Sequence, residues 1–291
     1  MPDRSRRDPA LTGSSLAGGL LLFLLGGAVS GCGGAACPAT PIEDASQAIE
    51  ARRGETARSE TLRAEARVTQ RGQEGRIRGT VLLLVERPDR VRFDATTQLV
   101  GAAAVLTSDG DVFALKDLRE NRFLEGPACP ENVARLLGIP LAGDEVARFL
   151  FGDTPLLPGA ETRAPSCTRE GTYLIEQRSP DGRRQEIELR VRDEDRAAPA
   201  EAQRLQLVRS ERFEAGGSTE WRATFDDYRS VRDRRTGERV SLPMQIRFEH
   251  PALEADTRVK MKDVDLGIDI PEGAFRQPVP PGMAPEYVPC E

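Results

Sequence analysis

One stretch limits the folds open to this 291-residue chain more than any other: residues 131–152, ENVARLLGIPLAGDEVARFLFG, the only clear helical pair among many strand-like segments. Apolar residues repeat at helical spacing up to Gly138, and the same spacing returns after Asp144 and stops at Gly152. Each half predicts a short amphipathic helix. Two such helices cannot bury their apolar stripes against each other alone, so both should lie on a sheet.

The segments on either side alternate apolar and polar residues with a period of two, as in residues 62–68, 77–85, 187–191 and 221–225. This period is typical of strands with one buried face. Short turns separate the strands, which favours antiparallel neighbours. The sequence therefore predicts a mainly β fold with some α-helix: a half-open antiparallel β-barrel, or curved sheet, with the short helices as its lid.

A further helix is expected before the first strand. Thr40 is a candidate N-cap, because Pro41 follows at the first helical position and Glu43 completes a capping-box pattern. We expect this helix to run to about Arg53.

The first 31 residues have the organisation of an export signal. Three arginines precede an apolar run over residues 16–29, which is too short to span a bilayer of about 30 Å as a helix. The run ends in Val29, Ser30, Gly31 and Cys32, a pattern that resembles the bacterial lipobox. That resemblance implies cleavage before Cys32 and its acylation with palmitate-like chains, and several acyl chains give stable anchoring. The alternative is an ordinary signal peptide with a chance cysteine.

This interpretation divides the chain into four parts. They are a lipoprotein signal peptide (1–31), the acylated Cys32 with a flexible tether (32–39), one barrel domain (40–270) and a Pro-rich C-terminal tail (271–291) with Phe275 as its anchor. Gly33 follows the cysteine at the position where Asp favours retention in the inner membrane of enteric bacteria. We therefore expect a lipid anchor in the outer membrane, on its periplasmic face.

Four cysteines remain if Cys32 carries lipid: Cys37, Cys129, Cys167 and Cys290. An even number in an exported chain suggests two disulfides, and three connectivities are open. Our hypothesis pairs Cys129 with Cys167, joining the lid to the following strand, and Cys37 with Cys290, joining the two ends. No metal site is expected, because no CxxC occurs and the chain has a single histidine.

The sequence offers little for catalysis or for nucleic acid. His250 is the only candidate base for a hydrolase, and it stands at a strand end; no GxSxG, Walker-type or GxGxxG pattern occurs. Asp226 and Asp227 are neighbours on a strand and would point to opposite faces. A net charge of −6 argues against a nucleic-acid surface. We therefore expect neither an enzyme nor a cofactor.

What remains is apolar surface on the inward side of the strands and lid. This side could be a packed core or a lipid-sized cavity, and the pattern alone does not separate the two. The positions concerned are Leu83, Val85, Phe93, Leu136, Leu137, Val146, Phe149, Leu150, Trp221, Phe225, Met244, Ile246, Phe248 and Met261.

Three segments, residues 90–115, 136–152 and 242–267, resemble in order and approximate spacing the LolA/LolB-like lipoprotein-localisation superfamily, and within it the LolB-type outer-membrane receptors. The resemblance implies a half-open barrel around helices, with an apolar cavity that takes lipoprotein acyl chains. It also implies that a periplasmic LolA-like carrier delivers the cargo. The receptors carry an exposed leucine on a loop just before a glycine, a place held here by Leu99 and Val100.

The sequence thus predicts an outer-membrane lipoprotein that binds acyl chains of lipoproteins or phospholipids and assists their transfer into the outer membrane. The main alternative is an envelope scaffold or interaction lipoprotein with a packed barrel and a protein partner on its edge strands or tail. Bound lipid would separate the two.

Overall fold

The computed structural model describes residues 37–72, 75–97 and 101–290, which belong to one compact unit, Gly34–Glu291. No helix of these described residues has the length and apolarity needed to cross a membrane. The helices are α1 (Ala45–Thr56), α2 (Pro130–Leu137) and α3 (Gly143–Leu150), with short 3-10 helices η1 (Asp193–Asp195), η2 (Ala200–Ala202) and η3 (Pro251–Leu253). The strands are β1 (Thr61–Gly72), β2 (Gly75–Glu86), β3 (Arg90–Thr97), β4 (Gly101–Ser108), β5 (Val112–Asp117), β6 (Arg122–Pro127), β7 (Glu161–Thr162), β8 (Ser166–Cys167), β9 (Tyr173–Arg178), β10 (Arg184–Val191), β11 (Leu205–Phe213), β12 (Thr219–Arg232), β13 (Arg239–His250), β14 (Ala255–Leu266) and β15 (Pro285–Tyr287).

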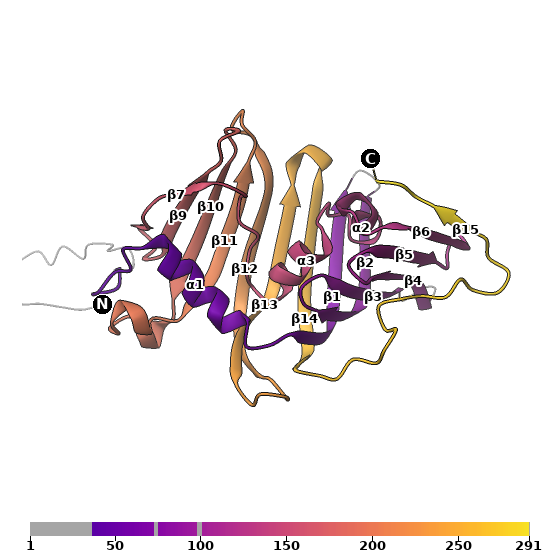
Figure 1. Ribbon diagram of the computed structural model, residues 1–291, viewed down its shortest axis with the longest axis horizontal. Helices are drawn as coiled ribbons and strands as arrows, with labels where there is room; N and C mark the ends of the chain where they lie inside the picture. Colours follow the sequence, from indigo (N-terminus) through magenta and orange to yellow (C-terminus); the bar gives the residue numbers. More distant parts are fainter. Residues whose placement is uncertain (1–36, 73–74, 98–100, 291) are drawn as a thin grey trace, which may run out of the picture. The chain divides into compact units, whose positions relative to one another are not determined.

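All these strands belong to one sheet, in the order β15-β6-β5-β4-β3-β2-β1-β14-β13-β12-β11-β10-β9-β7, with β8 paired to β9. Every described pairing between strands is antiparallel except that of β15 with β6. The sheet is curved and does not close (Figure 1). The prediction of a mainly β, half-open antiparallel architecture is confirmed.

The sheet is built from two runs of consecutive strands that meet between β1 and β14. The first run, β1 to β6, extends to one edge, and the second, β7 to β14, returns from the opposite edge. The meeting point pairs Leu62 with Leu266 and Val68 with Val259. The segment with α2 and α3 carries the chain from the first run to the second.

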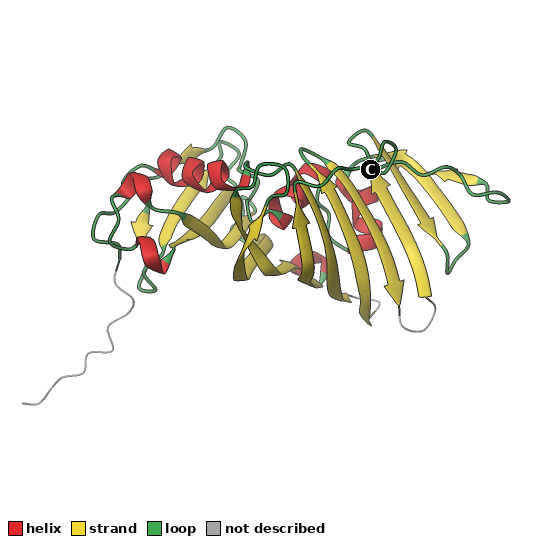
Figure 2. Ribbon diagram, turned by 90° about the horizontal axis from the view of Figure 1, so that it is seen from below, coloured by secondary structure: helices red, strands yellow, loops and turns green. Residues whose placement is uncertain are grey.

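Helices α1, α2 and α3 lie on one face of the sheet, which we call the inner face (Figure 2). Alternate residues of the strands point to this face and form the core, as β1 shows with Leu62, Ala64 and Ala66, all fully buried. The opposite, outer face carries the charged residues between them. The period-two pattern therefore corresponds to one buried and one solvated side.

Both lid helices begin and end close to their expected positions. Gly138 and Gly152 adopt positive φ angles of 64° and 73°, the left-handed conformation that ends a helix readily at glycine. In Figure 1, α3 lies over β13 and β14, and α2 lies over the β1–β6 half of the sheet. The predicted helical pair is confirmed.

The expected start of the first helix was wrong. Helix α1 begins at Ala45, and its N-cap is Asp44, whose carboxylate accepts from the Ser46 N–H at 2.8 Å. The segment before it is held extended by tertiary contacts: the Ile42 N–H donates to the Tyr173 hydroxyl at 3.0 Å. A local capping pattern cannot reveal such a partner 131 residues away.

The proposed disulfide pairing was also wrong. Cys37 is bonded to Cys167, and Cys129 to Cys290. Cys129 follows β6 and Cys167 lies in β8, beside β9, so the sheet order places these two cysteines at opposite edges. They cannot meet, and each bonds to one end of the chain instead.

The C-terminal tail runs along the β6 edge. The Val288 N–H donates to the Glu125 carbonyl at 2.8 Å, and Arg122 forms an ion pair with Glu286 at 2.7 Å. Phe275 is buried, 5% exposed, as expected for an anchor. The sequence pattern did not indicate the short parallel strand β15.

Candidate functional site: an apolar cavity beneath the lid

A cavity of about 60 Å³ lies between the lid and the inner face of the sheet. Thr257 contributes the one polar side chain among the residues around it. The lining consists of Val68, Leu83, Phe93, Ile139, Leu141, Val146, Phe149, Leu150, Ile246, Phe248, Thr257 and Val259. A space with this lining favours hydrocarbon over water, because it offers almost no hydrogen-bond partner.

The cavity walls follow directly from the two periodicities of the sequence. The sheet contributes inner-face positions on β1, β2, β3, β13 and β14, such as Leu83 and Ile246. The lid contributes Val146, Phe149 and Leu150, one stripe of α3, and also Ile139 and Leu141 from the link between α2 and α3. The two link residues were missed because they belong to neither helical pattern.

Phe149 anchors the lid to the sheet through an aromatic cluster. Its ring lies 5.4 Å from the ring of Trp221, edge-on, and 5.9 Å and 6.0 Å from those of Phe225 and Phe248. Trp221 and Phe248 stack on each other at 5.8 Å. Such pairs add about 0.5–1.5 kcal/mol each beyond the area they bury. Phe149 is therefore the main apolar attachment of α3.

The N-terminal end of α3 lies against the turn between β2 and β3. Gly143 is buried there, and a Cβ at this position would overlap the backbone carbonyl of Asp89. Only glycine allows this close approach without a shift of the helix.

The C-terminal end of α3 is held by a buried arginine from α1. The Arg52 guanidinium, 3% exposed, donates to the carbonyls of Gly152 at 2.9 Å and Phe151 at 3.0 Å. It also lies 3.6 Å from the Glu55 carboxylate, which in turn pairs with Arg192. These contacts join α1, the end of the lid and the sheet in one network. The end of α3 that follows Phe149 is thus fixed more firmly than its start.

Two acidic side chains flank a buried arginine next to the aromatic cluster. Arg212 lies 3.8 Å from the Glu145 carboxylate of α3, and its guanidinium stacks 4.8 Å from the Trp221 ring. Burial raises the pKa of Glu145 and of Glu220, and burial lowers the pKa of Arg212, because each loses hydration of its charged form. Charge at this edge of the lid is therefore sensitive to pH.

The structure brings together only part of the predicted cavity set. Leu83, Phe93, Val146, Phe149, Leu150, Ile246 and Phe248 line the cavity. Val85, Trp221, Phe225, Met244 and Met261 are buried in the surrounding core instead. Leu136 and Leu137 lie on α2, but their side chains are outside the described part of the structure, as are Leu99, Val100 and Cys32.

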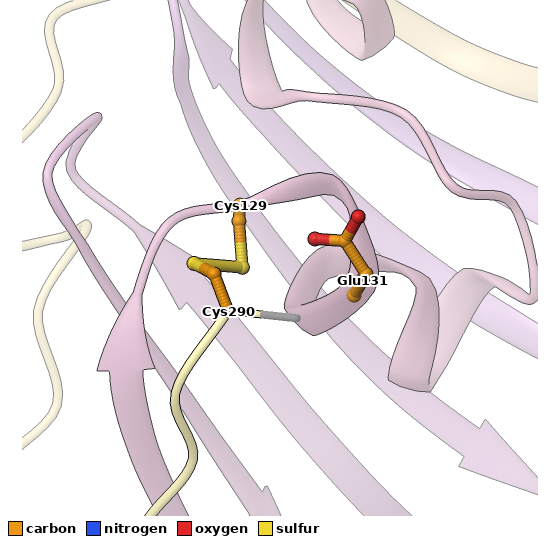
Figure 3. Close-up of side chains that lie close together, drawn as sticks. All are labelled: Cys129, Glu131 and Cys290. Carbon is orange, nitrogen blue, oxygen red and sulfur yellow. A yellow bond between two sulfur atoms is a disulfide. The ribbon is translucent and has the colours of Figure 1, made fainter.

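One group of potential metal ligands occurs among the described residues, and it is a disulfide. Figure 3 shows Glu131 beside the bonded sulfurs of Cys129 and Cys290. A disulfide has no thiolate to offer a metal ion, so this group does not form a metal site. His250 is half-buried at the end of β13, and burial lowers its pKa.

Comparison with known proteins identifies the fold. No protein-family model and no curated protein sequence matches the chain. Among solved structures, a DUF1329 family protein from Desulfovibrio piger superposes with a TM-score of 0.54 and 11% identity, covering 81% of this chain and 98% of its own. A LolA superfamily protein from Nitrosomonas europaea gives 0.52 and 10%, covering 81% and 99%.

A third structure, a domain from Vibrio parahaemolyticus assigned to outer-membrane lipoprotein sorting, gives a TM-score of 0.51 and 12% identity, covering 78% of this chain and 95% of that domain. Each likeness extends over nearly the whole of the other chain, although only 10–12% of the residues are identical. The protein therefore has the LolA-like fold, a curved and unclosed antiparallel sheet with short helices on its inner face.

Proposed function

We propose that the protein binds acyl chains of a lipoprotein or a phospholipid between α3 and the inner face of the sheet, and assists their transfer into the outer membrane. The observation that carries this proposal is the apolar cavity beneath α3. The fold supports it, because solved proteins of similar fold are assigned to the LolA superfamily and to lipoprotein sorting. A lipid anchor on Cys32 would place the protein at the membrane that receives the cargo.

The cavity must enlarge before it can hold an acyl chain. Its volume is about 60 Å³, whereas sites for small ligands typically measure ~300–1,000 Å³. The lid is the part that can move, because the sheet is bonded strand to strand while α3 is attached mainly through side chains. Arg52 holds the C-terminal end, so we propose that the N-terminal end of α3 lifts away from Asp89.

Replacing the side chains of α3 by an acyl chain in the cavity changes the free energy little. Lifting α3 exposes Val146, Phe149 and Leu150, each worth about 1.5–3 kcal/mol of burial. A chain of about ten methylenes that takes their place contributes on the order of 8 kcal/mol at roughly 0.8 kcal/mol per methylene. Near balance suits a protein that must both accept and release its cargo, and no covalent step is required. A periplasmic LolA-like carrier would supply the cargo.

The test uses the exported chain with Cys32→Ser, so that no anchor lipid is present. Its native mass is recorded before and after organic extraction, and a fluorescent fatty acid is then titrated into the extracted protein. We expect co-purifying mass in the range of an acyl lipid, or saturable uptake of the probe. A clean mass together with no uptake would overturn the proposal.

Two variants locate the binding site. Val259→Phe fills the cavity from a half-buried strand position, and we expect it to lower probe uptake at least five-fold. Leu82→Phe adds the same aromatic ring at an outer-face residue that is 51% exposed, and should leave uptake unchanged. Gly143→Ala should speed uptake, because the added methyl separates α3 from the β2–β3 turn. Equal effects of the two phenylalanines would place the ligand elsewhere.

The small volume of the cavity also fits the alternative function, a scaffold protein with a packed barrel and a protein partner. The same titration with the fatty-acid probe decides between lipid binding and this scaffold function. A protein that folds normally and takes up no probe would direct the search to partners of the sheet edges.

A further inference from the structure

We infer that the outer face of β1, β2 and β14 is a docking surface for anionic lipid headgroups. Six exposed cationic side chains gather there, and we call them the basic face. They are Arg67, Arg71, Arg76, Arg78, Lys260 and Lys262. All six alternate with inward-pointing residues of their strands and so lie on the side of the sheet opposite the lid and its cavity.

The strand register places like charges directly opposite each other within this face. Arg71 pairs with Arg76 across β1 and β2, and Arg67 pairs with Lys260 across β1 and β14. Side chains in such positions have Cβ atoms about 4.5–5.5 Å apart, and like charges there are destabilising. These two pairs therefore lower the stability of the fold, as is common for residues that serve in binding.

None of the six side chains forms an ion pair or hydrogen bond with another residue of the described chain. The neighbouring arginines of the same face do: Arg247 and Arg258 both contact the Asp256 carboxylate, and Arg63 contacts Asp265. In the sequence, Glu74 is the one acidic residue between positions 67 and 78, which hold four arginines. The register does place an acidic residue opposite two of the six, Asp256 opposite Arg71 and Glu65 opposite Lys262. The basic face nevertheless lacks the ion pairs found around it, on a chain whose net charge is −6.

A groove of about 390 Å³ adjoins the basic face. Arg67 and Lys260 line it together with Arg247, Arg258 and the carboxylate of Asp226. A phosphate-bearing headgroup has room in a groove of this volume, whereas a flat charged surface would offer it no recess.

Exposed apolar side chains border the same strands and favour a bilayer over a soluble anion. Leu82 on the outer face of β2 is 51% exposed, whereas Ile77, between Arg76 and Arg78, alternates to the other side of the strand and is 45% exposed there. Leu253 in the turn between β13 and β14 is 47% exposed, and the register puts that turn at the same end as Arg71. Cations beside apolar residues match the interface of an anionic membrane, which attracts each basic residue and also accepts the apolar ones.

This inference does not depend on the acyl cavity, which lies on the other face. The test uses the exported chain with Cys32→Ser and vesicles of phosphatidylcholine, alone or with about 30% phosphatidylglycerol. We expect sedimentation with the anionic vesicles alone, and a loss of binding between ~50 and ~500 mM salt as screening shortens the reach of the charges.

A charge-matched pair of variants locates the surface. Replacing Arg67, Arg71, Arg76 and Arg78 with Gln should weaken vesicle binding by about five-fold per residue. Replacing four exposed arginines that have acidic partners, Arg122, Arg163, Arg229 and Arg235, removes the same charge elsewhere and should change binding less than three-fold. Equal losses in the two variants would overturn the inference, as would unchanged binding in the first. Both are checked for native circular dichroism.

Competition identifies the kind of anion. Inorganic phosphate at millimolar concentration and polyglutamate are added to the vesicle assay at constant ionic strength. We expect neither to displace the protein, because neither offers an apolar phase to Leu82 and Leu253. Displacement by phosphate would assign the face to a soluble anion, and tight binding to polyglutamate without vesicles would assign it to an acidic protein; either result overturns the lipid assignment. Acyl-probe uptake is measured separately, so failure here leaves the cavity proposal intact.

Discussion

At the scale of single residues, the lid depends on a few side chains whose environments differ sharply. Phe149 attaches α3 through apolar contact, whereas Arg52 attaches its end through hydrogen bonds to carbonyls. Glu145 is different again: it accepts from the Ala142 N–H at 3.1 Å and so supports the start of α3, but its charge is partly buried. Replacing this residue separates the two effects.

We predict that Glu145→Gln makes the stability of the protein less dependent on pH. Burial is the largest cause that raises the pKa of Glu145, and repulsion from Asp144 and Glu220 adds to it, while the hydrogen bond from the Ala142 N–H and the charge of Arg212 act in the opposite direction. The stabilisation from the protonated carboxyl is complete below the unfolded pKa, near 4.5, and is lost as the pH rises through the native pKa. Glutamine keeps an acceptor without the charge, so the variant should be more stable than the wild type at pH 7.5 and equal to it near pH 4.

Urea unfolding at several pH values between 4 and 7.5 measures this difference. Glu131→Gln, an exposed residue in the first turn of α2, serves as the control for a change in net charge. A Glu145→Gln variant that is less stable than the wild type at pH 7.5 would show that the attraction to Arg212 outweighs the cost of burial.

At the scale of secondary-structure elements, the tail strand β15 stands out because it is the one parallel strand among the described strand pairs of the sheet. It pairs in parallel with the edge strand β6, and Cys290, which follows it, is bonded to Cys129, the N-cap of α2. Asn132 of α2 donates to the carbonyl of Val288 at 3.1 Å. The tail therefore covers an edge that would otherwise be open to pairing with other chains, and it also contacts the lid.

We predict that Gly126→Ala detaches this strand. A Cβ at position 126 would overlap the Val288 carbonyl, so the tail must move and its hydrogen bonds to Glu125 and Asn132 are lost. At about 1 kcal/mol per hydrogen bond, we expect a loss of about 1–3 kcal/mol in the free energy of unfolding. Thermal unfolding measures the loss, and limited proteolysis measures the exposure of residues 277–290.

Gly54→Ala in α1 is the matched control, because a Cβ there meets nothing within 4 Å. Alanine in a helix interior should stabilise the protein by up to about 1 kcal/mol. An unchanged melting temperature and an equally protected tail in Gly126→Ala would contradict the proposed role of Val288.

At the scale of the whole molecule, the two disulfides act at opposite edges of the sheet. We predict that non-reducing peptide mapping recovers Cys37 linked to Cys167 and Cys129 linked to Cys290. Removing either bond by a double Cys→Ser substitution should cost about 2–5 kcal/mol, the usual range for the loss of a native disulfide. Recovery of a peptide that links Cys129 to Cys167 would contradict the sheet order itself.

The resistance to proteolysis should differ between the two double variants. Loss of the Cys129–Cys290 bond releases the tail beside β6, whereas loss of the Cys37–Cys167 bond releases the segment before α1. Protease digestion followed by mass measurement distinguishes the two ends. Cleavage at the same site in both variants would mean that the bonds do not act locally.

The sequence by itself determined the local elements, because their signals are local. The strand period, the left-handed glycines at positions 138 and 152 and the amphipathic stripe of α3 all depend on residues within a few positions of one another. These signals were enough to predict a curved antiparallel sheet with a helical lid, and the resemblance to the LolA/LolB-like superfamily pointed to the same fold.

Only the tertiary structure decided which distant segments meet. The pairing of β1 with β14, the extended segment held by Tyr173 before α1, the disulfide partners and the path of β15 all join residues more than 100 positions apart. The cavity volume and the pairing of Arg67 with Lys260 on the basic face depend on the same long-range register. Contacts of this kind form when the two runs of strands pair with each other at β1 and β14. The local periodicity of the sequence holds no information about that pairing.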